Sequence, residues 1–251
     1  MVIQKQGGVF LGRARIAKKY ENRGARHVTA EIQGIKNNLV WAPFGGILQN
    51  PFPGIAKLYE ADPLYIEYDD KGENPKLWCI KTYLAAVAST AKKLTLVRDG
   101  FKHKVFVGDT LMVAPDEFGG AGKIANVTAV TATTDSNGNK VWEVTLDTAL
   151  TVAKDDVLVE GIALAESDSD GNTGKWIVNG CNGWTPCDMD FVYEPVADPE
   201  DEENFDDAEY GFTPVAGVCA YTHRMSPLPK AILALNRCGW NGIFMHTATP
   251  I

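Results

Sequence analysis

The stretch Val141-Trp142-Glu143-Val144-Thr145-Leu146 decides the fold class. Trp142, Val144 and Leu146 alternate with the other three residues, which is the period of a strand with one buried face. Asp135-Ser136-Asn137-Gly138-Asn139 comes just before it, and Asn-Gly tolerates the positive φ that tight hairpins need. The β-branched run from Ile124 to Thr133 precedes that turn, so the sequence predicts an antiparallel hairpin.

Short runs of the same kind continue on both sides of this hairpin. They are rich in β-branched and aromatic residues, and we expect further strands at Leu94–Val97, Lys104–Val107, Leu111–Val113 and Val157–Val159. Turn-forming residues separate them, at 98–100, 108–109, 119–122 and 154–156. Short strands at this spacing are typical of a small antiparallel β-barrel or sandwich, which we expect over residues 82–165.

Residues 1–80 carry Gly, Pro and aromatic residues without a sustained period. Because Pro and Gly at this density break helices, we expect an extended N-terminal arm with short strands. Its aromatic side chains favour burial against another domain or subunit. These aromatic residues are Trp41, Phe44, Phe52, Tyr59, Tyr65, Tyr68 and Trp78.

Residues 166–251 are predicted to form a third, β-rich segment. A polar loop at 166–174 is followed by a return to strand structure between Gly174 and Tyr193. We expect the acidic run 198–209 to be a loop, because like charges repel and little apolar surface offsets the ordering entropy. Ser226-Pro227-Leu228-Pro229 then introduces a short helix over residues 230–237, and a last strand follows at 242–246.

Composition places the chain among ordinary globular proteins. It has 251 residues, a formal net charge of −8 and 45% hydrophobic residues. No apolar run reaches the roughly 18 residues of a membrane-spanning helix, and the N-terminus lacks a secretory signal pattern. We therefore expect synthesis and retention in a cytoplasm and no membrane partner. Five scattered cysteines are unlike a secreted disulfide framework, so reduced thiols are expected.

Charge is unevenly distributed along the chain. Residues 1–40 contain eight basic and two acidic side chains, whereas residues 198–209 contain eight acidic and no basic ones. Complementary charge of this kind can steer one copy onto its neighbour or a partner, although each run is also explained as a solvated surface. The stretch from Arg13 to Arg26 can contact phosphates. Because the whole chain is acidic, nucleic acid is not expected as the main partner.

The sequence carries no motif for catalysis or cofactor binding. It lacks a phosphate-binding loop, a G-x-S-x-G elbow and an H-E-x-x-H zinc pattern. Cys181 and Cys187 are too far apart for a typical zinc pair and are interpreted as buried thiols. The loop from Asp168 to Asn172 fails both calcium-loop registers and is interpreted as a turn. We predict no catalytic, cofactor-binding or metal-ligating residue, no cofactor, and surface or core roles for the histidines His27, His103, His223 and His246.

Two groups of segments resemble a known family. The first lies between residues 82 and 160 and consists of Thr82–Ala86, Leu94–Val97, Gly100–Lys102, Val107–Leu111, Ile124, Val144–Leu150 and Asp156–Glu160. The second consists of Gly217–Tyr221 and Arg224–Ala231. In their order, these segments resemble the head-associated structural proteins of tailed phages infecting Bacteroidales, including crAss-like phages, of the auxiliary capsid or head fibre type.

The resemblance implies a non-enzymatic virion protein on the phage head, assembled in the host bacterial cytoplasm. Its expected partners are the major capsid protein, neighbouring virion subunits and head fibre proteins. A decoration or cementing role is the leading hypothesis. The alternatives are a head fibre base, a portal-tail connector, a capsid lattice protein, a nucleic-acid-binding internal head protein that uses the basic arm, and a host-surface carbohydrate-binding module or hydrolase. The last would use exposed Trp176 and Trp184 as a sugar platform.

Overall fold

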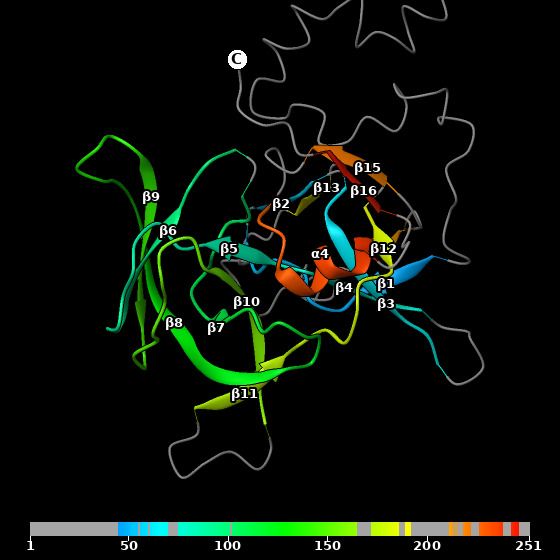
Figure 1. Ribbon diagram of the computed structural model, residues 1–251, viewed down its shortest axis with the longest axis horizontal. Coiled ribbons are helices and arrows are strands. Elements are labelled where there is room, and N and C mark those ends of the chain that lie inside the picture. The colour runs from blue at the N-terminus through cyan, green and yellow to red at the C-terminus, as the bar shows by residue number, and fades with distance from the viewer. Residues whose placement is uncertain are drawn as a thin grey trace, which may run out of the picture.

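A computed structural model describes a mainly β protein, which confirms the predicted fold class at that level (Figure 1). The basic stretch 1–40 and the acidic run 198–209 lie outside the described residues. The structure describes residues 45–54, 56–59, 61–69, 75–100, 102–164, 172–185, 189–191, 211–212, 214, 218–221, 226–237 and 242–245.

The largest sheet has seven strands and contains the predicted hairpin. Its path runs β11-β10-β7-β8-β9-β6, and β5 pairs with β10 beside that path. An isolated bridge between Ala85 and Leu96 brings the end of β5 to β6. The strands are β5 (Thr82–Leu84), β6 (Lys93–Val97), β7 (Thr110–Val113), β8 (Ala121–Thr134), β9 (Lys140–Leu146), β10 (Val157–Ala163) and β11 (Thr173–Trp176).

β8 is the long curved strand of Figure 1, and it changes partners along its length. Residues 121–123 pair with β11, residues 124–126 with β7, and the remainder with β9. The change to β9 comes at Val127, and a β-bulge follows between Val127 and Ala129. The part beyond the bulge projects as a hairpin with β9.

A second sheet joins the early and late parts of the chain in the order β12-β3-β4-β1-β14. Its five strands form four pairs of adjacent strands. Some paired residues are far apart in sequence, since Gly46 in β1 pairs with Phe212 in β14, 166 positions later. Its strands are β1 (Gly46–Leu48), β3 (Pro63–Glu67), β4 (Lys76–Cys79), β12 (Gly183–Trp184) and β14 (Gly211–Phe212). Three strands from residues 1–80, namely β1, β3 and β4, therefore lie within this sheet. The division of the chain into arm, barrel and C-terminal segment stays a prediction.

Two strand pairs and one helix complete the described structure. β2 (Ala56–Leu58) pairs with β13 (Met189–Phe191), and β15 (Val218–Tyr221) pairs in parallel with β16 (Gly242–Met245). The helix α4 spans Lys230–Arg237, as its flanking Pro and Gly residues predict. The last predicted strand is also confirmed, since β16 lies within it.

Two local predictions are wrong. No strand forms over Lys104–Val107, because Asp109 Oδ2 accepts the Phe106 N–H at 2.8 Å and folds this stretch into a loop. The predicted turn at 119–122 ends early, since Ala121 and Gly122 already belong to β8. Gly122 suits that strand because a Cβ there would approach Met112 Cε to 3.0 Å.

The hairpin turn is confirmed, with glycine providing the positive φ. Gly138 has a φ of 85°. The Asp135 N–H donates to Asn139 O at 2.9 Å and the Gly138 N–H to Asp135 O at 3.0 Å. This pattern is a three-residue hairpin loop with a left-handed glycine. It fixes the register of β8 against β9, which pairs Thr134 with Lys140.

Three apolar clusters form the core of the described structure. One lies inside the seven-stranded sheet and includes Leu96, Leu111 and Leu158. A second packs against the five-stranded sheet and includes Phe52, one of the aromatic residues predicted to be buried. The third joins β11 and β12 to the helix through Trp176, Trp184 and Ile232. The described parts of the two sheets are thus each backed by their own buried side chains.

Candidate functional site

A set of polar and ionisable side chains lies buried among these clusters, and we call it the buried polar cluster. It draws on both sheets, because Asn50 and Asp62 come from the segment of the five-stranded sheet whereas His103, Asp109 and Glu160 come from the seven-stranded part. Its members are Asn50, Asp62, Lys81, Tyr83, His103, Asp109 and Glu160.

Asp62 and His103 form the most deeply buried contact of the cluster. Both side chains are fully shielded from solvent, and His103 Nε2 lies 3.0 Å from Asp62 Oδ2. His103 Nδ1 accepts the N–H of Thr82 at 3.0 Å, so Nε2 carries the hydrogen and donates it to Asp62. Asp62 Oδ2 also accepts the Tyr59 N–H at 2.6 Å. The imidazole is therefore held in one tautomer between two chain segments.

Asn50, Lys81 and Glu160 form the second part of the cluster. Asn50 Nδ2 donates to Glu160 Oε2 at 2.7 Å and to Cys79 O at 2.9 Å, while its Oδ1 accepts the Cys79 N–H. Lys81 Nζ lies 3.4 Å from Glu160 Oε1 and 5.1 Å from the centre of the Phe52 ring. A buried ammonium group is thus compensated by a carboxylate and an aromatic face.

Tyr83 and Asp109 form the third part. The Tyr83 hydroxyl donates to Asp109 Oδ2 at 3.1 Å. Burial, followed by the charge of Asp109, raises the pKa of Tyr83 well above its usual value. Burial also raises the pKa of Asp109, although the nearby Lys81 and the Phe106 N–H oppose that change. This contact closes the loop that replaces the predicted strand at 104–107.

Two thiols are buried in the described core, and Cys79 lies beside the buried polar cluster, where Asn50 hydrogen bonds to its backbone. Cys79 and Cys181 are both free and shielded from solvent. This confirms the interpretation of Cys181 as a buried thiol, while Cys187 lies outside the described residues. Burial raises the pKa of both thiols, and the charge of Asp62 adds to this at Cys79.

The raised thiol pKa values predict that stability falls in alkaline solution. An unfolded thiol ionises near pH 8.5, whereas each folded thiol keeps its proton to higher pH. Above that pH the unfolded state binds fewer protons, so the free energy of unfolding falls by up to about 1.4 kcal/mol per pH unit for each thiol. Denaturant unfolding between about pH 8 and pH 10 measures this slope. Cys181→Ala should make the decline shallower, and an unchanged slope would contradict the prediction.

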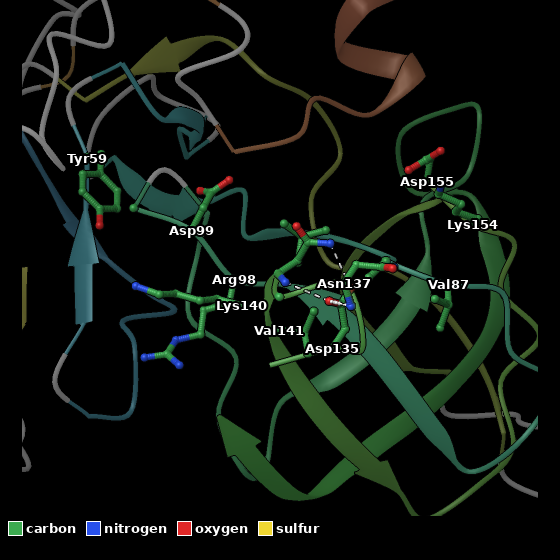
Figure 2. A pocket seen from close by; sticks show the side chains of 15 residues that line it. Tyr59, Val87, Arg98, Asp99, Asp135, Asn137, Lys140, Val141, Lys154 and Asp155 are labelled. Carbon is green, nitrogen blue, oxygen red and sulfur yellow. Dashed lines mark hydrogen bonds between the residues drawn. The ribbon is translucent and has the colours of Figure 1, made fainter. Parts of the chain in front are cut away.

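An open groove lies at the outer end of the β8–β9 hairpin (Figure 2). Its volume is about 1100 Å³, and Figure 2 shows Tyr59 on one side and the turn containing Asn137 on the other. The turn is rigid, because the Asp135 carboxylate accepts the N–H groups of Asn137 and Asn139, each at 2.8 Å. The Asn139 side-chain amide also donates to Asp135 Oδ2 at 3.0 Å, and this hydrogen bond, followed by the one from the Asn139 N–H, lowers the pKa of Asp135.

Charges of both signs line the groove. The basic side chains are Arg98, Lys140 and Lys154, and the acidic ones are Asp99, Asp135 and Asp155. Arg98 stacks on Trp142, with its guanidinium carbon 4.7 Å from the ring centre. A surface with this balance can bind a polar partner that itself carries both charges.

The structure decides several sequence predictions about individual residues. Trp176 and Trp184 are 1% and 0% exposed, so the sugar-platform hypothesis for them is wrong. His103 is a core histidine with both ring nitrogens hydrogen bonded, in agreement with its predicted role. The polar loop from Glu166 to Gly171, His27, His223 and His246 lie outside the described residues.

The buried polar cluster itself was not predicted. Its only local signal is Lys81, a charged residue within the otherwise apolar run from Trp78 to Leu84. In the described part of the chain, no three or more His, Cys, Asp or Glu side chains are placed to hold a metal ion. No helix within the described ranges has the length and apolarity to cross a membrane.

Comparisons with protein families, curated proteins and solved structures find no match.

Proposed function

We propose that this protein is a non-enzymatic structural protein of a phage virion. In this proposal it is an auxiliary protein of the head that binds the major capsid protein lattice and stabilises it. It assembles on the head in the host bacterial cytoplasm and contacts neighbouring virion subunits. The order of the segments that resemble Bacteroidales phage head proteins supports the family assignment.

The proposal depends on one observation: the side chains of the buried polar cluster are engaged in holding the fold together. Its side chains, which include a His–Asp pair, point into the interior and bond to one another. They link segments 26 to 110 residues apart in sequence, so their role is to hold the fold together. A protein that reinforces a lattice benefits from such a rigid body, since it must transmit load between its contacts.

The seven-stranded sheet supplies a compact body for this role. β5 pairs with β10, and the Ala85–Leu96 bridge brings β5 to β6, the last strand of the path. We propose that these strands wrap into the small barrel expected from the sequence. The groove at the hairpin end would then be a rigid contact surface for the capsid that carries both positive and negative charges.

Capsid binding tests the proposal directly. The full chain should co-sediment with capsids of its own phage at physiological salt. Lys154→Glu reverses an exposed charge in the groove and should weaken binding about ten-fold, which corresponds to about 1.4 kcal/mol. Lys123→Glu makes the same change at an exposed position of β8 away from the groove and should bind normally.

The two parts of the proposal fail separately. If the wild-type chain does not bind its capsids, the auxiliary head role is wrong. If it binds and Lys154→Glu binds equally well, the groove is not the contact surface.

A further inference from the structure

The outer half of β8 has a free edge. β7 and β9 lie on opposite sides of β8. Within the described structure, β7 pairs only with residues 124–126 of β8, so residues from Ala129 to Thr134 pair with β9 alone. The covered part ends at Val127, where the loop before β7 is bonded through Gly108 N–H to Val127 O. We call residues 129–134 the β8 edge.

The backbone direction along this edge follows from the pairing. Arg98 N–H donates to Lys140 O at 3.1 Å, so the polar backbone groups of Lys140 face β6 and not β8. Lys140 lies opposite Thr134, and antiparallel ladders alternate. Thr134, Ala132 and Val130 therefore direct their N–H and C=O groups away from β9, toward the free side.

The side chains do not protect this edge. Ala129, Thr131, Ala132 and Thr134 are exposed, and residues 126–134 contain no charge and no proline. Proteins usually guard exposed edges with lysine, proline or a bulge. The bulge at Val127/Ala129 lies before the β8 edge, and the pairing with β9 is uninterrupted from Ala129 to Thr134.

We propose that the β8 edge pairs with the same edge of a second copy of this chain. The pairing is antiparallel about a two-fold axis at Ala132, so that Ala132 faces Ala132 of the second copy and Val130 faces its Thr134. This register uses all three outward-facing residues on each copy. It is bounded by the hairpin turn at one end and the bulge at the other.

A second copy fits this edge for two reasons. A two-fold interface requires a patch that is complementary to itself, and small, uncharged Ala, Thr and Val residues meet that requirement without repulsion. The outward N–H and C=O groups alternate in the way an antiparallel copy of the strand would satisfy. This inference goes beyond capsid binding, because it concerns the isolated protein and does not depend on the proposed function.

Sedimentation equilibrium of the full chain over a concentration series tests the pairing. We expect a monomer–dimer equilibrium for the wild type. Ala132→Lys should abolish the dimer, because it places two positive charges opposite each other at the two-fold axis. Ala163→Lys is the matched control, since Ala163 is an exposed alanine of β10. A wild-type monomer at all concentrations, or an Ala132→Lys dimer as strong as wild type, would overturn the proposal.

Oxidative cross-linking tests the register. Residues facing each other in a hydrogen-bonded pair have Cα atoms about 5.5 Å apart, which is within the range of roughly 4.4–6.8 Å for disulfides. Ala132→Cys should therefore form a covalent dimer, while Thr133→Cys, displaced from the axis and on the other face, should stay at the wild-type level. The reverse pattern would overturn this register. If the free chain is monomeric but Ala132→Lys abolishes capsid binding, the edge belongs to a capsid strand and not to a second copy.

Discussion

Asp62→Ala is expected to lower the free energy of unfolding by about 3–5 kcal/mol, because it leaves buried polar partners without compensation. The Asp62 carboxylate is fully shielded from solvent and accepts from His103 Nε2 and the Tyr59 N–H. Alanine removes that acceptor and opens a polar gap between the two sheets. Equilibrium unfolding in denaturant measures the change, with an unchanged m-value showing that the variant unfolds as one unit.

Asp99→Ala is the control for this prediction. Asp99 has a side chain 41% exposed and lies 3.5 Å from Lys102, so its removal should cost less than about 0.5 kcal/mol. If both variants were equally stable, the Asp62–His103 contact would not hold the sheets together, and the rigid-body argument for the proposed function would lose its support.

The β8–β9 hairpin was predictable because its information is local. Alternation in Val141–Leu146 specifies the strand, and Asn137-Gly138 specifies the turn between adjacent strands. The buried face is as predicted at Val144 and Leu146, whereas Val141 on the other face is buried as well. The helix over residues 230–237 was predictable for the same reason, since proline and glycine mark its two ends. In each case neighbouring residues carry the whole signal.

The five-stranded sheet and the buried polar cluster were not predictable, because their contacts are distant in sequence. Gly46 pairs with Phe212, and Asn50 bonds to Glu160 across 110 positions. Asp62 before a proline looks like a turn residue, and nothing local shows that it meets His103. Even Lys104–Val107 has strand-like residues, but a side-chain hydrogen bond from Asp109 fixes it as a loop.

Exposure is likewise a property of the whole fold and not of the residue type. Trp176 and Trp184 are large enough to serve as a binding platform, but they are buried in one cluster with side chains of the helix and of β7, β8 and β10. Their burial removes the structural basis of the sugar-binding alternative that depended on them. It also makes one of them a sensitive probe of the core.

Trp176→Ala is expected to destabilise the protein by about 3–5 kcal/mol, the usual cost of removing a buried tryptophan and leaving a cavity. Trp176 is 1% exposed and stacks on Phe118, with ring centres 5.0 Å apart. Trp142→Ala is the matched control. Trp142 is half-buried beneath Arg98, so its loss should cost clearly less. Thermal and denaturant unfolding of the two variants measure the difference, and equal losses would show that the cluster around Trp176 relaxes to fill the space.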